Sequence, residues 1–224
     1  PNSFVKAKNK EIDSFINALP SYDDDDLDIE APMEYQRSSK KPSEIEDVVI
    51  EKIPTGIESF DSTTGGIIKG SCNCIGGDPG IGKSSLMLKI GNNLASQRKK
   101  VLYTGHEMPL WMTKQYCQRL GPWNEWSDRR WNFQYTDDVH EIINEISILK
   151  PMLVLVDSLQ YIRNPQIDSK TGSDPQLKSC AKLLTEASKE FMCCIYLICH
   201  VTKDGNIAGP MSVEHAVDAI WFLE

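Results

Sequence analysis

Three common patterns are missing from this sequence, and each absence excludes a class of protein. The seven cysteines form no paired Cys-x₂-Cys framework, so we expect no zinc site, and free buried thiols in a reducing compartment. No apolar run approaches the roughly 18 residues that cross a bilayer. The first residues carry no signal-peptide hydrophobic region. We therefore expect a cytoplasmic protein without a membrane span.

An overall basic charge is also missing, but the acidity is unevenly spread. The formal net charge is −8, and residues 1–48 hold 6 Lys and Arg against 12 Asp and Glu. The remaining residues hold 18 against 20 and are close to neutral. The acidity of the whole chain therefore does not exclude a nucleic-acid partner.

The chain divides into an N-terminal arm, residues 1–47, and a core, residues 48–224. Residues 4–19 have the apolar spacing of a short helix, and an acidic run, residues 21–30, follows it. Such a run repels itself and buries no core, so it predicts a flexible, solvated spacer. The alternative is that helix and acidic run dock on a neighbouring subunit or a protein partner.

Strand-like and helical patterns alternate throughout the core. We expect strands at residues 70–76, 100–105, 131–136, 152–157, 193–200 and 219–223. We expect helices at residues 82–96, 109–120, 138–149 and 174–191. Near-continuous Leu, Ile and Val strands separated by helices are typical of a mainly parallel sheet covered on both faces. The predicted fold class is α/β.

One glycine-rich stretch carries the strongest chemical signal. Gly77-Asp-Pro-Gly-Ile-Gly-Lys-Ser matches the pattern G-x₄-G-K-[ST], with a predicted strand before it and a helix after it. Backbone N–H groups of such a loop, together with the helix N-terminus, neutralise phosphate. Lys83 is expected to reach the β- and γ-phosphates of ATP, and Ser84 to bind Mg²⁺. The nucleotide-binding residues predicted here are Gly77, Asp78, Pro79, Gly80, Ile81, Gly82, Lys83, Ser84 and Ser85.

A buried carboxylate is the expected companion of a phosphate loop. Asp157 follows five apolar residues, at the carboxyl end of a predicted strand. A carboxylate there is costly unless it is paired or holds a metal, so we interpret it as the second Mg²⁺ ligand. The alternative is an Asp that caps the following turn.

Two further strand ends supply candidate catalytic groups. Glu107 follows the strand at 100–105 and is our candidate for orienting the attacking water; the alternative is a Glu favoured by a helix N-terminus. His106 is the weaker candidate for the base. His200 follows the apolar strand residues 194–198 and is our candidate γ-phosphate sensor; the alternative is a packed strand-end histidine.

These residues together resemble the bacterial RadA/Sms branch of RecA-like ATPases, over about residues 53–223. The matching pieces include residues 54–61 with Gly65-Gly66, the phosphate loop, 101–107, 156–160 and 200–210, followed by Glu214-His215 and Val217-Asp218. The stretch at 200–210 is the most specific of these pieces. RecA and DnaB-type helicases are looser relatives.

The resemblance implies a ring-forming, typically hexameric ATPase, a helicase that encircles single-stranded DNA and promotes branch migration in recombinational repair. It assigns Lys83 and Ser84 to phosphate and Mg²⁺, Asp157 to the metal and Glu107 to catalysis. Residues 161–172 and 201–210 would be loops facing the central channel. Arg163, Lys170 and Lys203 are then candidate DNA-phosphate contacts; each is otherwise a solvated surface charge.

Three departures from the family pattern are expected to matter. The four-cysteine zinc module is replaced by the acidic arm, and the protease-like C-terminal domain is missing. The Lys-Asn-Arg-Phe-Gly segment would lie beyond Glu224 or be absent. The arm suggests a divergent or virus-encoded version, in a bacterial or virus-infected cytoplasm. A DnaB-like replicative helicase and a nucleotide-switched assembly or signalling protein without motor activity remain as alternatives.

Overall fold

The computed structural model describes residues 40–45, 51–200 and 213–224. Residues 40–45 contain one 3₁₀ turn, η1 (Pro42–Glu44), in which the Lys41 amide donates to the Glu44 carboxylate. The predicted N-terminal helix, the acidic run and the proposed boundary near residue 48 lie outside the described residues.

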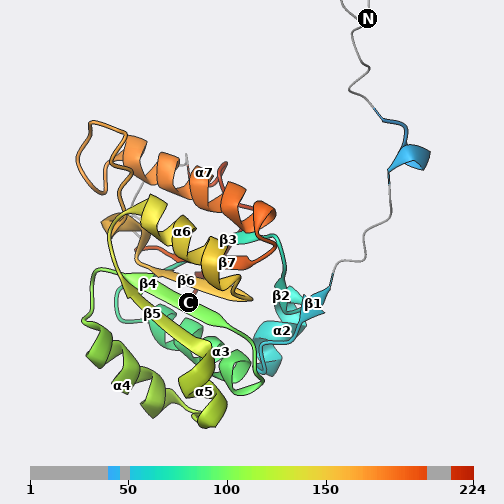
Figure 1. Cartoon of the computed structure of the whole chain (residues 1–224), viewed down its shortest axis with the longest axis vertical. Helices are drawn as coiled ribbons and strands as arrows, with labels where there is room; N and C mark the ends of the chain where they lie inside the picture. Colours follow the sequence, from blue (N-terminus) through green and yellow to red (C-terminus); the bar gives the residue numbers. More distant parts are fainter. Residues whose placement is uncertain (1–39, 46–50, 201–212) are drawn as a thin grey trace, which may run out of the picture. The chain divides into compact units, whose positions relative to one another are not determined.

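The core is built on a sheet of six strands (Figure 1). Its strands are β3 (Cys72–Gly77), β4 (Val101–Gly105), β5 (Trp131–Tyr135), β6 (Leu153–Asp157), β7 (Cys194–Ile198) and β8 (Ala219–Leu223). The strand order is β5-β4-β6-β7-β3-β8, and every pairing is parallel. A two-stranded antiparallel pair, β1 (Lys52–Ile53) and β2 (Ile67–Ile68), precedes the sheet.

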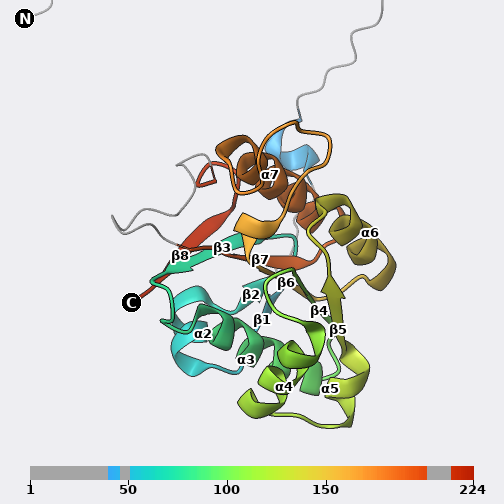
Figure 2. The same cartoon turned by 90° about the vertical axis from the view of Figure 1, so that its left-hand side faces the viewer.

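Helices cover both faces of the sheet (Figures 1 and 2). One face carries α2 (Glu58–Thr64), α3 (Lys83–Ser96), α4 (Leu110–Leu120) and α5 (Glu125–Arg130). The other face carries α6 (Val139–Leu149) and α7 (Asp174–Glu190), with the 3₁₀ turn η2 (Leu159–Tyr161) after β6. The predicted α/β class is confirmed, and the six predicted strands and four predicted helices occur with ends shifted by at most two residues.

Alternate residues of the central strands β3, β4, β6 and β7 enter two separate hydrophobic clusters. Val154 and Val156 of β6 pack with α6 and α7, whereas Leu153 and Leu155 pack with α3. This alternation explains why the strands read as continuous apolar runs, since both faces of a covered parallel sheet are buried. Every described cysteine is free and buried, as the sequence predicts for reduced thiols.

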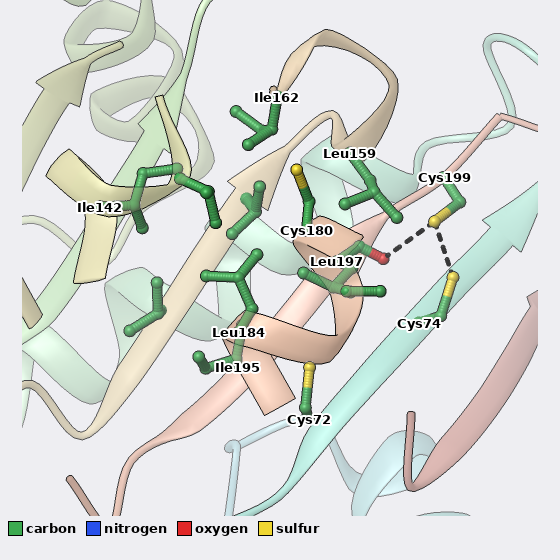
Figure 3. Close-up of a cluster of buried hydrophobic side chains, with 14 of the residues drawn as sticks. Cys72, Cys74, Ile142, Leu159, Ile162, Cys180, Leu184, Ile195, Leu197 and Cys199 are labelled. Carbon is green, nitrogen blue, oxygen red and sulfur yellow. Dashed lines mark hydrogen bonds between the residues drawn. The ribbon is translucent and has the colours of Figure 1, made fainter. Parts of the chain in front are cut away.

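Cysteines are concentrated in the cluster between the sheet and α7 (Figure 3). The Sγ atoms of Cys74, on β3, and Cys199, just after β7, lie 2.7 Å apart. Both positions lie shortly before the segments that carry the candidate site. These small side chains let β3 and β7 approach the helix layer closely.

Candidate nucleotide-binding site

The phosphate loop connects the end of β3 to the start of α3. Gly77, Gly80 and Gly82 have φ angles of 147°, 82° and 106°, which only glycine adopts without strain. A Cβ on Gly77 would lie 2.7 Å from the Leu223 carbonyl oxygen, so β8 closes one side of the loop. At Gly80 and Gly82 no atom of the described residues lies within 4 Å of such a Cβ. The other side of the loop is therefore open for a ligand.

Lys83 is folded over this loop. Its side chain is 5% exposed, and its ammonium donates to the carbonyl oxygens of Gly77 at 2.7 Å and Asp78 at 2.9 Å. A buried ammonium needs such partners. The geometry keeps the positive charge inside the loop, where phosphate oxygens would compete for the same donors.

Ser84 and Asp157, the two predicted Mg²⁺ ligands, lie within hydrogen-bonding distance of each other beside the loop. Asp157 is 4% exposed, and burial raises the pKa of its carboxyl group above the usual range. A hydrogen bond from Ser84 opposes this rise in pKa, whereas the charge of Glu107 adds to it. A hydroxyl and a carboxylate are ligands of the hard kind that Mg²⁺ prefers.

Tyr103 is a contributor that the sequence reasoning missed. It is 1% exposed on β4, and its hydroxyl donates to Asp157 Oδ2 at 3.2 Å. Burial and the negative charge of Asp157 both raise the pKa of Tyr103, so its hydroxyl stays protonated and remains a donor. One sequence signal could have identified it: Tyr103 is a polar aromatic residue in a predicted strand, two residues before the strand's carboxyl end.

Glu107 and His200 face each other across the ends of β4 and β7. Glu107 Oε2 and His200 Nε2 are 3.8 Å apart, and the side chains are 44% and 35% exposed. Gln160, from the turn after β6, donates to the His200 carbonyl oxygen at 3.5 Å. The two residues therefore lie beyond the carboxyl ends of β4 and β7, the strands on either side of β6, which carries Asp157 at its own carboxyl end.

Two buried hydroxyls beside this group have no partner among the described residues. They belong to Thr104, on β4, and Ser158, which follows Asp157. Buried polar groups of native proteins are normally hydrogen-bonded, so unpaired ones point to a ligand or water at this place. Their position is consistent with a polar ligand held at the carboxyl edge of β4 and β6.

The three candidate DNA contacts differ in their surroundings. Arg163 pairs with Asp137, Nε to Oδ2 at 2.8 Å, and the two side chains are 41% and 37% exposed. Lys170 is exposed, and Lys203 lies outside the described residues. The loop that carries Arg163 and Lys170 is anchored by Gln176 of α7, whose Nε2 donates to the carbonyl oxygens of Asn164, Ile167 and Ser169 at 3.0–3.2 Å.

The arrangement fits ATP with Mg²⁺. The open glycine loop and Lys83 suit the phosphates, Ser84 and Asp157 suit the metal, and Glu107 lies where a water could be oriented. Within the described residues, no three or more His, Cys, Asp or Glu side chains come together in a way that could hold a metal ion. Among the helices that the structure describes, none is long and apolar enough to span a membrane.

Comparisons with known proteins show the family of the chain. The family described as DnaB-like helicase C terminal domain matches residues 52–124. The chain is 37% identical over 172 residues, or 76% of its length, to "DNA repair protein RadA" of Mycobacterium tuberculosis. It is 35% identical over 189 residues, or 83% of its length, to the protein of the same name from Bacillus subtilis.

The chain spans only 35% and 40% of the lengths of these two relatives. Among solved structures, "The Structure Of A DnaB-Like Replicative Helicase And Its Interactions With Primase" matches with a TM-score of 0.64 and 16% identity. The match covers 79% of this chain and 54% of the other. It shows that the core has the fold of the DnaB helicase C-terminal domain.

Proposed function

The chain contains a RecA-like ATPase domain of the RadA type, and from this premise we propose that it couples ATP hydrolysis to movement along single-stranded DNA within a hexameric ring. The observation that carries the proposal is the convergence of Lys83, Ser84, Asp157 and Glu107 at the carboxyl edge of one parallel sheet. A protein that only binds nucleotide needs the first three residues. It has little need of a carboxylate placed to orient water.

Each of these residues has a defined task in the proposed reaction. Lys83 and the loop amides bind the phosphates and neutralise their charge. Bound Mg²⁺ supplies positive charge at the phosphate oxygens, and Ser84 and Asp157 are the side chains that would hold it. Glu107 orients the attacking water and accepts its proton.

His200 is proposed to connect hydrolysis with DNA. It contacts Glu107 on one side, and on the other side it directly precedes residues 201–210. A change at the γ-phosphate position would therefore reach that segment through one side chain. Lys203 in this segment, with Lys170 and Arg163 after β6, are the proposed contacts to DNA phosphates.

Arg163 fits this role only if DNA displaces Asp137. The two side chains are more than a third exposed, so their ion pair is weak and can be exchanged for a phosphate contact. The proposed place of action is the bacterial or virus-infected cytoplasm, in recombination or repair. The acidic arm, residues 1–47, is proposed to bind a protein partner.

A second candidate is a replicative helicase. The specific observation in its favour is the match of residues 52–124 to the DnaB-like C-terminal domain. Both candidates require a DNA-stimulated motor. They differ in the DNA substrate that is processed, because branch migration needs a joint of homologous strands and replication needs a fork.

Glu107→Gln separates a motor from a nucleotide-switched scaffold. We expect this variant to bind ATP and single-stranded DNA like the wild type, because Lys83, Ser84 and Asp157 are unchanged, but to lose hydrolysis and strand displacement. Size-exclusion chromatography in ATP measures assembly, and a fork with a labelled strand measures displacement. Equal strand displacement by both proteins would contradict the assignment of Glu107, and a wild type that displaces no strand would contradict the motor.

A further inference from the structure

A cluster of arginines around one tryptophan lies at the edge of the sheet opposite the nucleotide site. Trp126 is half-buried on α5, and the guanidinium carbons of Arg98, Arg129 and Arg130 lie 4.2, 5.5 and 5.9 Å from its ring centre. Arg98 comes from the end of α3, which packs beside α5 (Figure 1). We call these four residues the Arg–Trp cluster.

The arginines of the cluster form no ion pair with the acidic side chains that the structure describes. The two acids of α5 are Glu125 and Asp128, and Asp128 is paired with Lys114 at 3.6 Å. Like charges gathered without counter-charge repel one another, so an external anion would stabilise them.

Two local features indicate that stability of the fold alone does not explain this arrangement of side chains. Arg98 has a φ of +68° directly after α3, at a position where glycine is the favoured residue. Arg130 Nε is buried and has no hydrogen-bond acceptor among the described residues. The chain thus holds an arginine in an unfavoured backbone conformation and leaves a donor unpaired, both within one cluster.

We propose that the Arg–Trp cluster is a second binding surface for single-stranded DNA. The inference rests on the proposed action on DNA and extends it to a place that the channel loops do not include. Guanidinium groups form forked hydrogen bonds to phosphate and stack on bases, and an indole ring adds a further stacking face. An acidic polypeptide would be recognised by the charges alone, without an aromatic ring among them.

The cluster is spatially separate from the other candidate DNA contacts. It precedes the start of β5, whereas Arg163 and Lys170 follow the end of β6, and these strands run parallel in one sheet. Five strand residues separate the two edges by about 16 Å. Single-stranded DNA bound at the cluster would therefore lie outside the loops that are proposed to face the channel.

Anisotropy of a fluorescein-labelled oligothymidine, titrated at several salt concentrations, tests the proposal. The test variant is Arg98→Gln with Arg129→Gln. The matched control is Lys178→Gln with Lys182→Gln on the exposed side of α7, which removes the same charge elsewhere. All four side chains are exposed, so both variants should fold, and melting temperature and ATPase rate without DNA should match the wild type.

The cluster variant is expected to bind the oligothymidine more weakly than the control variant does. The magnitude of its slope of log affinity against log salt should be smaller than that of the control by about 1.4, for two lost phosphate contacts. Equal effects of the two variants, or no effect of either, would overturn the proposal. Loss of poly-glutamate binding with unchanged DNA binding would also overturn it, in favour of an acidic protein partner. A wild type that binds no DNA would refute the proposed function itself, which is a distinguishable result.

Discussion

Gly105→Ala tests whether the close approach of β4 and β6 positions the site. A Cβ at Gly105 would lie 2.1 Å from the carbonyl oxygen of Asp157 and 3.1 Å from its carbonyl carbon. Both atoms belong to backbone, so no flexible side chain can move aside. The carboxyl ends of the two strands must separate by about 1.3 Å or more to reach ordinary contact distance.

The expected cost has two parts. Overpacking of this kind costs about 1–3 kcal/mol of the free energy of unfolding. The separation also moves Glu107, two residues beyond Gly105, away from Asp157, and a misplacement of about 1 Å lowers a catalytic rate by roughly 100-fold. We therefore expect kcat for ATP to fall by about that factor while the protein remains folded.

Gly91→Ala is the matched control. Its Cβ would lie 2.4 Å from the Trp131 ring, so this variant is also overpacked, but in the middle of α3 beside the start of β5, away from the carboxyl ends of β4 and β6. Urea denaturation measures the stability of both variants, and steady-state ATPase assays measure kcat. If the two variants lose similar stability and kcat falls equally in both, the proposed role of the β4–β6 approach is wrong.

Three further predictions concern single side chains. Tyr103→Phe removes the donor to Asp157 Oδ2, and loss of such a supporting contact should raise the Mg²⁺ concentration needed for half-maximal hydrolysis by about tenfold or more; an unchanged Mg²⁺ titration would contradict it. Asp157→Asn should stabilise the nucleotide-free protein at neutral pH: burial raises the pKa of Asp157 in the folded state, so the wild type loses stability as pH rises from the unfolded pKa through the folded one, and the variant does not. Urea denaturation at several pH values should show equal stability of the variant and the wild type at low pH, and an increasing advantage of the variant as pH rises. A difference that does not depend on pH would refute the raised pKa of Asp157. Arg163→Ala should change stability by less than about 1 kcal/mol, because its ion pair is partly exposed, yet lower the salt slope of oligothymidine binding by about 0.7; an unchanged slope would remove Arg163 from the DNA contacts.

Much of the fold could be predicted from the sequence because a covered parallel sheet leaves a simple pattern. The strands at 153–157 and 194–198 are continuous apolar runs, and Asp157 and His200 stand out at their ends. The parallel arrangement then brings these strand ends to one edge, which is why the sequence alone assigns Lys83, Ser84, Asp157, Glu107 and His200 to one site.

Other features depend on contacts that no local pattern contains. The six-residue helix α5 is too short for helical periodicity to show. The pairing of Arg163 with Asp137 joins residues 26 positions apart, and Tyr103 contacts Asp157 only because β4 and β6 are neighbours. The strand order itself is a property of the folded chain and decided each of these contacts.

The most direct test of the central claim is the ATPase rate of the wild type and of Lys83→Ala, with and without single-stranded DNA. We predict a rate that DNA stimulates several-fold and that Lys83→Ala abolishes in both conditions, since the loop loses the ammonium now held by Gly77 and Asp78. A rate that depends on Lys83 but is indifferent to DNA would contradict the motor and leave a nucleotide-driven assembly in its place.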